Sequence, residues 1–161
     1  FMEKATLVIM CGVPGVGKDY AIHNEAFFEG FRENEVSRDK IRFGLLKEGE
    51  DYFSKEKEVF DEFVRQLSDG LKQGRTMIAN ATHITRASRK KLIRAIDDTG
   101  VQDYQIMIYC VNADTDVILR QNSQRTGLAC VPQEVILKMI NTYQTPMYRE
   151  DARIKLITIK Y

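Results

Sequence analysis

The segment that begins at residue 6 restricts the possible folds of this chain more than any other. Thr6–Met10 is a continuous apolar run that leads into a glycine-rich turn, a pattern typical of a strand buried on both faces. Gly12, Gly17 and Lys18 then fit the spacing G-x-x-x-x-G-K, and Asp19–Phe28 is expected to form a helix. A strand, a glycine turn and a helix in direct succession predict an α/β fold with a parallel sheet.

The rest of the chain repeats this alternation of short apolar runs and longer amphipathic ones. Further strands are predicted over Glu35–Ser37, Thr76–Ala79, Tyr104–Val111 and Ile154–Ile159. Helices are predicted over Lys55–Leu71, Arg86–Ile96, Asp114–Gln124 and Pro132–Tyr143. Because strands separated by helices form right-handed crossover units, we expect a doubly wound sheet of about five parallel strands with helices on both faces. Residues 2–161 are expected to form a single domain.

The glycine-rich turn is suited to holding phosphate. Glycines permit backbone angles and a close approach that a β-carbon would prevent, so successive N–H groups can point at phosphate oxygens. Lys18 would reach the β- and γ-phosphates of a nucleotide. A glycine-rich turn that binds nothing has no need of a lysine beside its last glycine. We therefore expect ATP to bind at Gly12, Val13, Pro14, Gly15, Val16, Gly17, Lys18 and Asp19.

Three further segments lie beyond successive predicted strands. They read Ser-Arg-Asp-Lys-Ile-Arg at 37–42, Asn-Ala-Thr-His at 80–83, and Arg-Gln-Asn-Ser-Gln-Arg-Thr-Gly at 120–127 with Val131-Pro132 after it. In this order the chain resembles P-loop kinases of the polynucleotide 5′-hydroxyl kinase type, a group of small AAA-like kinases. The resemblance extends over residues 6–145 and is shared with many small-molecule kinases of the same fold. It implies a P-loop kinase fold with a helical lid, and an ATP-dependent phosphotransferase that uses Mg²⁺.

The resemblance also implies roles for individual residues. Asp39 matches the general base that accepts the proton of the acceptor hydroxyl, and Arg42 matches the arginine that grips the acceptor. Arg125 matches the lid arginine that closes over the transferring phosphoryl group, and Arg120 is expected to assist at the nucleotide. Gln121 stands where relatives carry an arginine near the lid. Without the resemblance, Asp39 and Arg42 also fit a surface ion pair, and Arg120 and Arg125 also fit exposed residues at a helix end.

Two positions depart from the family pattern. Asp19 stands where serine or threonine normally ligates Mg²⁺, and Asn80 stands where many relatives have an aspartate. We hypothesise that the carboxylate has moved from the strand end to the turn, so that Asp19 binds Mg²⁺ directly or through water. Asn80, Thr82 and His83 would then contact water or substrate. The alternative is a degenerate, weakly active site, because Asp19 repels nucleotide phosphates when no metal is present.

Composition limits the classes of partner. Lys+Arg 24 against Asp+Glu 23 gives a net charge of +1, which does not indicate a protein that coats nucleic acid or a membrane surface. No apolar run approaches the ~18–20 residues that span a bilayer, and no secretory signal is recognisable. The three cysteines lack the spacing of a disulfide framework or a zinc site. A cytoplasmic protein is expected.

The acceptor is the least constrained part of the prediction. Arg86, Arg89, Lys90 and Arg94 form a basic side of the predicted helix 86–96, which fits contact with a polynucleotide backbone or, equally, a solvated face. The sequence favours transfer of the γ-phosphate to the 5′-hydroxyl of a polynucleotide. A kinase of a nucleoside, sugar or antibiotic is the first alternative, and a nucleotide-binding regulatory module without transfer activity is the second. Asp39 and Arg42 favour an enzyme, since a pure binder needs no acceptor-side base.

Overall fold

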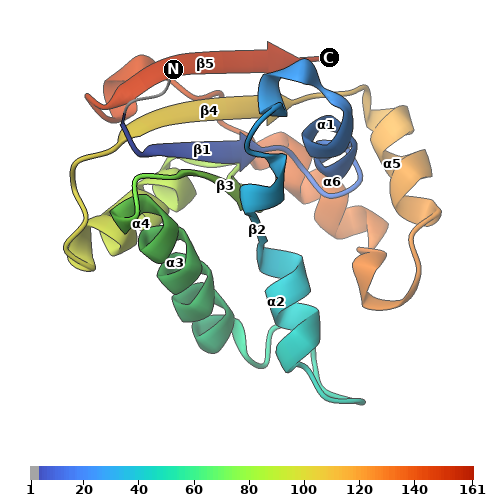
Figure 1. Ribbon diagram of the computed structural model, residues 1–161. Helices are drawn as coiled ribbons and strands as arrows, with labels where there is room; N and C mark the ends of the chain where they lie inside the picture. The colour runs from blue at the N-terminus through green and yellow to red at the C-terminus, as the bar shows by residue number, and fades with distance from the viewer. Residues whose placement is uncertain (1–3) are drawn as a thin grey trace.

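A five-stranded parallel sheet runs through the computed structural model, which describes residues 4–161. The strands lie in the order β2-β3-β1-β4-β5 (Figure 1). Their bounds are β1 Thr6–Cys11, β2 Glu35–Ser37, β3 Thr76–Asn80, β4 Gln105–Val111 and β5 Ile154–Lys160. The fully buried β1 pairs in parallel with β3 on one side and β4 on the other, as its unbroken apolar sequence predicts. The predicted strands and the doubly wound fold class are confirmed.

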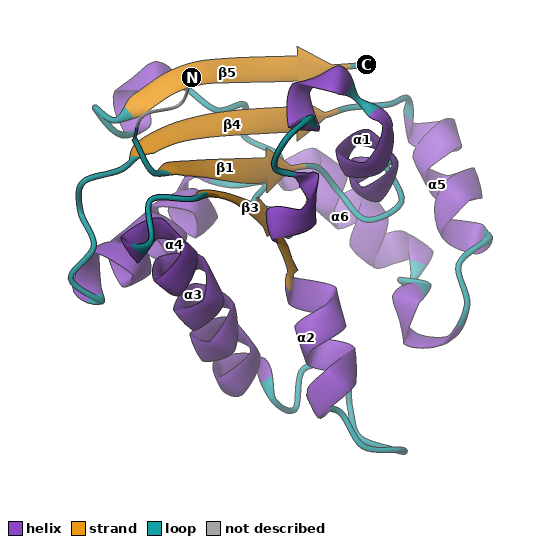
Figure 2. Cartoon of the chain, in the orientation of Figure 1, coloured by secondary structure: helices purple, strands orange, loops and turns teal. Residues whose placement is uncertain are grey.

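The helices lie between the strands, and all except Arg38–Leu45 fall on predicted helical segments. Their bounds are α1 Lys18–Asn24, α2 Arg38–Leu45, α3 Glu56–Lys72, α4 Arg86–Asp98, α5 Thr115–Ser123 and α6 Gln133–Thr142. The predicted helix Asp19–Phe28 is too long, because α1 ends at Asn24 and Glu25 is extended before a 3-10 turn over Ala26–Phe28. At the carboxyl end of β2, the Ser37 side chain accepts a hydrogen bond from the Lys40 amide and caps α2. Figure 2 shows α2 projecting away from the sheet before the chain returns to α3.

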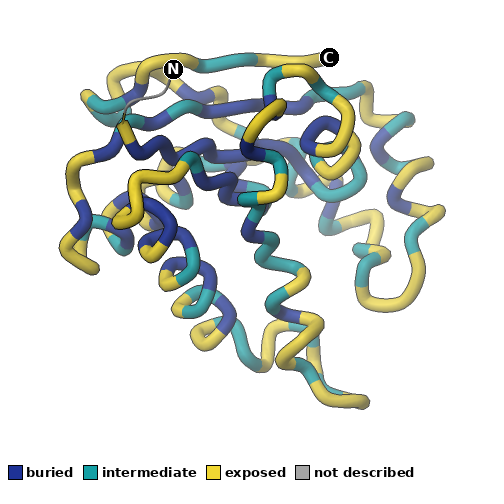
Figure 3. The backbone as a smooth tube through the Cα atoms, viewed as in Figure 1, coloured by how far each residue is buried: buried dark blue, intermediate teal, exposed yellow. Residues whose placement is uncertain are grey.

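Two apolar layers enclose the sheet, and alternate residues of β1 point into each. Leu7 and Ile9 belong to the layer shared with α3 and α4. Val8 and Met10 belong to the other, which includes residues of α1, α5 and α6. Figure 3 shows β1 in the buried colour throughout, whereas exposed residues lie on the outer strand β5, the outer turns and the helix faces. The carboxyl edge of the sheet is therefore held rigidly from both sides.

The prediction that Arg89 belongs to a basic face of α4 is wrong. Arg86, Lys90 and Arg94 are exposed, but Arg89 has an exposed fraction of 0%. The Arg89 guanidinium donates to both oxygens of Glu150 at 2.9 and 3.0 Å and to the backbone carbonyls of His83 and Gln144. A buried guanidinium must be paired and hydrogen-bonded in this way, so Arg89 ties α4 to the segment before β5 instead of facing a ligand.

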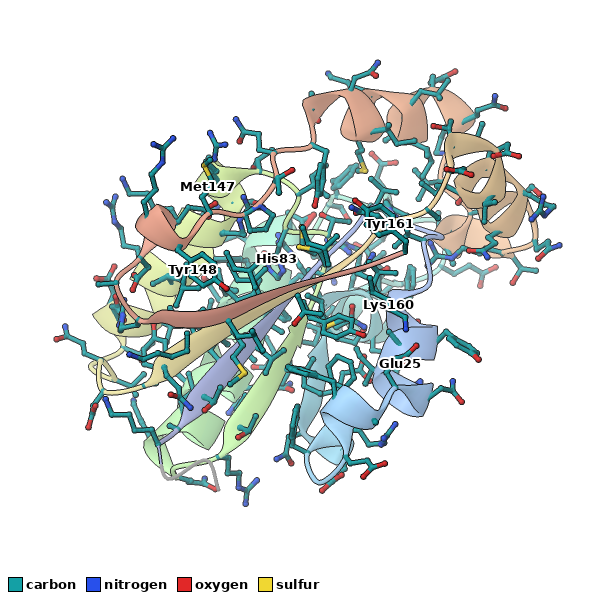
Figure 4. The ribbon with its side chains drawn as sticks, turned by 90° about the horizontal axis from the view of Figure 1, so that it is seen from above. Glu25, His83, Met147, Tyr148, Lys160 and Tyr161 are labelled. Carbon is teal, nitrogen blue, oxygen red and sulfur yellow. The ribbon has the colours of Figure 1, made fainter. Side chains whose placement is uncertain are left out.

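An ion pair also joins the outer strand β5 to the segment after α1. Lys160 Nζ on β5 lies 3.5 Å from Glu25 Oε1 beyond α1, and both are labelled in Figure 4.

Cys11 and Cys110 are register partners on β1 and β4 and are buried, whereas Cys130 is exposed; all three are free thiols. Within residues 4–161, no helix has the length and apolar character that crossing a membrane requires.

Candidate phosphate-transfer site

The carboxyl ends of β1, β2 and β3 meet at one edge of the sheet, where α/β proteins of this topology bind ligands. The glycine loop, residues 12–19, leaves β1 at this edge. A β-carbon on Gly12 would lie 2.8 Å from both the Val111 carbonyl oxygen and Val16 Cγ1. Gly15 has a φ of +83°, and a β-carbon there would lie 3.1 Å from the Asn122 amide of α5. Both glycines are thus required by the packing of the loop itself.

Lys18 is folded back onto the glycine loop. Its Nζ donates to the carbonyl oxygens of Gly12 and Val13 at 2.7 and 3.1 Å. Burial lowers the pKa of Lys18 to about 8, although the carboxylates of Asp19 and Asp39 act in the opposite direction. The Lys18 ammonium group therefore lies against the backbone of the glycine loop, within electrostatic range of Asp19 on α1 and Asp39 on α2.

Asp19 and Asn80 are in direct contact, although 61 residues separate them in the sequence. The Asn80 amide nitrogen donates to Asp19 Oδ1 and to Glu35 Oε2, at 2.7 Å in each case. Asn80 is only 6% exposed, and its two acidic partners bring carboxylate oxygens to the side of the glycine loop. Carboxylates are the ligands that Mg²⁺ prefers, so Asp19 and Glu35 have the donor chemistry for a divalent cation. Glu35 was missed by the sequence analysis, because no motif marks the first residue of a short strand.

Asp39 lies in a network of hydrogen bonds at the start of α2. Arg42 Nη1 donates to Asp39 Oδ1 at 2.6 Å, and Arg42 Nη2 donates to both carboxylate oxygens of Glu56 at 2.5 and 2.9 Å. The Tyr52 hydroxyl donates to the same Asp39 Oδ1 at 2.9 Å. Arg42 is 5% exposed, so it is not the surface residue that an isolated ion pair would suggest. Tyr52 and Glu56 were also missed, since neither belongs to a recognisable motif.

The segment after α5 brings an arginine to this network. Arg125 Nη2 lies 3.9 Å from Asp39 Oδ2, and the Arg125 side chain is 29% exposed. The buried Asn122 exchanges two hydrogen bonds with the Val131 backbone, which closes residues 122–131 into a loop. We call residues 124–132 the lid. Arg120 is exposed on α5, one helical turn or more before the lid.

Of residues 80–83 at the carboxyl end of β3, Thr82 contacts the glycine loop and His83 is buried. The Thr82 carbonyl accepts a hydrogen bond from the Gly12 amide at 2.9 Å, so this residue meets the glycine loop through its backbone. His83 is 4% exposed, its Nδ1 lies 2.9 Å from the Met10 carbonyl, and its ring stacks on Phe63. Burial lowers the pKa of His83 to about 4, which keeps the ring neutral. His83, labelled in Figure 4, is therefore a buried residue that bonds to β1 and packs against α3.

Comparisons with known proteins identify the family and the fold of this chain. The family model AAA_33, described as an AAA domain, matches residues 7–146. Curated proteins give no match to the sequence. An unliganded sugar kinase from Janibacter sp. HTCC2649 has a TM-score of 0.63 and 16% identity, with 96% of this chain and 85% of that chain covered.

Two further solved structures have similar folds. A chain of the Pnkp1/Rnl/Hen1 RNA repair complex has a TM-score of 0.70 and 18% identity, with 87% of this chain but only 44% of that chain covered. A gluconokinase from Sinorhizobium meliloti 1021 has a TM-score of 0.55 and 14% identity, with coverages of 96% and 82%. At these identities the matches establish a shared fold, that of P-loop kinases.

Proposed function

This chain belongs to the AAA_33 family of AAA domains, and on that premise we propose that it transfers the γ-phosphate of ATP to a hydroxyl group. One observation carries the proposal. Asp39 Oδ2 lies 3.9 Å from the Arg125 guanidinium, and the Asp39 carboxylate is near enough to Lys18 to oppose the lowering of the Lys18 pKa by burial. An acid close to both the phosphate-binding lysine and a lid arginine is suited to deprotonate an alcohol that attacks a phosphoryl group.

The residues divide the reaction between them. The acceptor hydroxyl gives its proton to Asp39 while its oxygen forms a bond to the γ-phosphorus. The bond from that phosphorus to the β–γ bridging oxygen breaks, and its electron pair leaves with ADP. Lys18 and Arg125 offset the negative charge on the transferring group.

A divalent cation fits the acids beside the glycine loop. Asp19 and Glu35 present carboxylate oxygens that converge on the Asn80 amide nitrogen, and these residues would hold Mg²⁺ directly or through water. When bound, Mg²⁺ neutralises phosphate charge. The same pairing supports the hypothesis that Asp19 supplies, from the glycine loop, the charge that many relatives carry at the position of Asn80.

The 5′-hydroxyl end of a polynucleotide is our first candidate acceptor. The order of segments 37–42, 80–83 and 120–132 supports it, as does the similarity to a chain of an RNA repair complex. A small hydroxyl-bearing molecule is the second candidate. Both Nη atoms of Arg42 are already bonded to Asp39, Tyr52 and Glu56, an arrangement that suits an acceptor without a phosphate of its own.

Transfer of labelled phosphate tests the proposal directly. The enzyme is incubated with γ-labelled ATP, Mg²⁺ and a panel of 5′-hydroxyl oligonucleotides, nucleosides and sugars. We expect the wild-type enzyme to label the oligonucleotide and the Asp39→Asn variant to leave it unlabelled. Label on a small molecule alone would select the second candidate. ATP binding without label on any acceptor would indicate a regulatory nucleotide-binding module and overturn the proposal.

A further inference from the structure

The loop between α2 and α3 returns one aromatic side chain to the start of α2. The Tyr52 hydroxyl donates to Asp39 Oδ1 at 2.9 Å and accepts from Arg42 Nη1 at 2.9 Å. The Arg42 guanidinium lies 4.3 Å above the Tyr52 ring. Phe53 packs edge-on against the same ring, with centroids 4.7 Å apart. The ring is therefore fixed by contacts that do not depend on its hydroxyl group.

The Tyr52 hydroxyl is a permanent donor to Asp39. Burial and the adjacent Asp39 carboxylate raise the pKa of Tyr52 to about 12. The hydroxyl consequently keeps its proton throughout the range in which enzymes operate. A neutral phenol cannot act as a base toward an alcohol, so its contribution is a hydrogen bond.

The two oxygens of the Asp39 carboxylate have different surroundings. Oδ1 accepts from Arg42 Nη1 at 2.6 Å and from the Tyr52 hydroxyl at 2.9 Å. Oδ2 lies 3.9 Å from Arg125 Nη2, outside hydrogen-bond distance, and the Asp39 side chain is 42% exposed. With two donors on one oxygen, rotation of the carboxylate would break both bonds. The free lone pairs of Oδ2 thus point toward the lid side of the site.

We propose that Tyr52 is a positioning residue that locks the Asp39 carboxylate, so that Oδ2 is the atom that receives the acceptor proton. This inference rests on the proposed function. The O–H bond of the acceptor breaks, its proton bonds to Oδ2, and the freed electron pair forms the bond to the γ-phosphorus. The charged groups around Asp39 are Lys18 of the glycine loop, Arg42 of α2, Glu56 of α3 and Arg125 of the lid.

Tyr52→Phe tests this role, since it keeps the ring and its contacts and removes only the hydroxyl. A hydrogen bond to a charged group is worth enough to change a rate by roughly tenfold or more. We expect kcat to fall about tenfold while KM for ATP stays within about twofold.

Tyr104→Phe is a matched control at the opposite end of the strands. The Tyr104 hydroxyl donates to Asp97 at 2.8 Å, and Arg153 lies 4.6 Å above its ring, so the variant loses an equivalent bond. Tyr104→Phe should retain the wild-type kcat.

Each failure has a distinct signature. A wild-type kcat in Tyr52→Phe, or an equal loss of kcat in Tyr104→Phe, would overturn the role of Tyr52 and leave the proposed function standing. Transfer that survives Asp39→Asn, or no transfer by the wild-type enzyme, would overturn both.

Discussion

The pH dependence of nucleotide affinity follows from the surroundings of Lys18. Burial lowers the pKa of this lysine to about 8 in the free protein, where its Nζ donates to the Gly12 and Val13 carbonyls. Phosphate oxygens favour the charged ammonium, so binding of ATP should raise the pKa again. Above pH 8, binding must therefore take up a proton, and affinity should fall as the pH rises.

The size of the effect follows from the fraction of charged lysine. With a pKa of about 8, about nine-tenths of Lys18 is charged at pH 7 and about one-tenth at pH 9. The affinity for ATP should then fall about tenfold over this interval. Stability of the empty protein should change in the opposite direction. Because the folded pKa lies below the unfolded value of 10.5, the unfolded chain binds more protons between these values, so Lys18 adds about 1 kcal/mol of stability from pH 7 to pH 9.

Calorimetric titration of ATP at pH 7, 8 and 9, in two buffers of different ionisation enthalpy, measures affinity and proton uptake together. We expect an uptake of about half a proton per ATP at pH 8. Lys18→Arg keeps its charge at all three values, so its affinity should be nearly independent of pH. An affinity of the wild-type protein that is equal at pH 7 and pH 9, with no proton uptake, would refute the reasoning.

Three further changes have defined outcomes. Glu150→Gln removes the charge that balances the fully buried Arg89 and should lower the free energy of unfolding by about 3 kcal/mol in urea denaturation; a loss under about 1 kcal/mol would contradict that pairing. Arg125→Ala should lower kcat roughly a thousandfold with little change in ATP affinity, and a change below about tenfold would remove Arg125 from the reaction. Asp19→Ala should weaken Mn²⁺ binding, followed by electron paramagnetic resonance in the presence of nucleotide, by at least about tenfold; unchanged Mn²⁺ affinity would exclude Asp19 as a ligand.

Short-range patterns explain why most elements could be predicted from the sequence. After Thr6, the run Leu7–Met10 has no polar position to place on a solvated face, which favours a central strand, and β1 is that strand. The end of α1 could not be predicted in the same way. Phe28 looks like the continuation of an amphipathic helix, yet its ring packs against Tyr109 of β4, with centroids 4.9 Å apart. A tertiary contact thus decides the helix end, and no residue near Asn24 signals it.

The candidate site shows why residue types alone do not identify function. Residues 4–161 contain two units in which a tyrosine hydroxyl donates to an aspartate that an arginine also binds. One joins Tyr52, Asp39 and Arg42, and the other joins Tyr104, Asp97 and Arg153. Their internal geometry is alike, but Tyr104 precedes β4, whereas Asp39 follows β2.

In a parallel sheet, a residue that precedes one strand and a residue that follows another lie at opposite ends of the strands. The glycine loop leaves β1 at the carboxyl end, which is the end where Asp39 lies. Proximity to Lys18 and Arg125 therefore distinguishes a group suited to accept a proton from one that stabilises the fold. The contacts of Tyr52 and Glu56 with the α2 segment form only when the chain has folded, so a single sequence carries no local signal for them. The glycine-loop motif was predictable because its functional residues are consecutive in the sequence. The residues around the candidate base Asp39 come from separate elements, so only the fold brings them together.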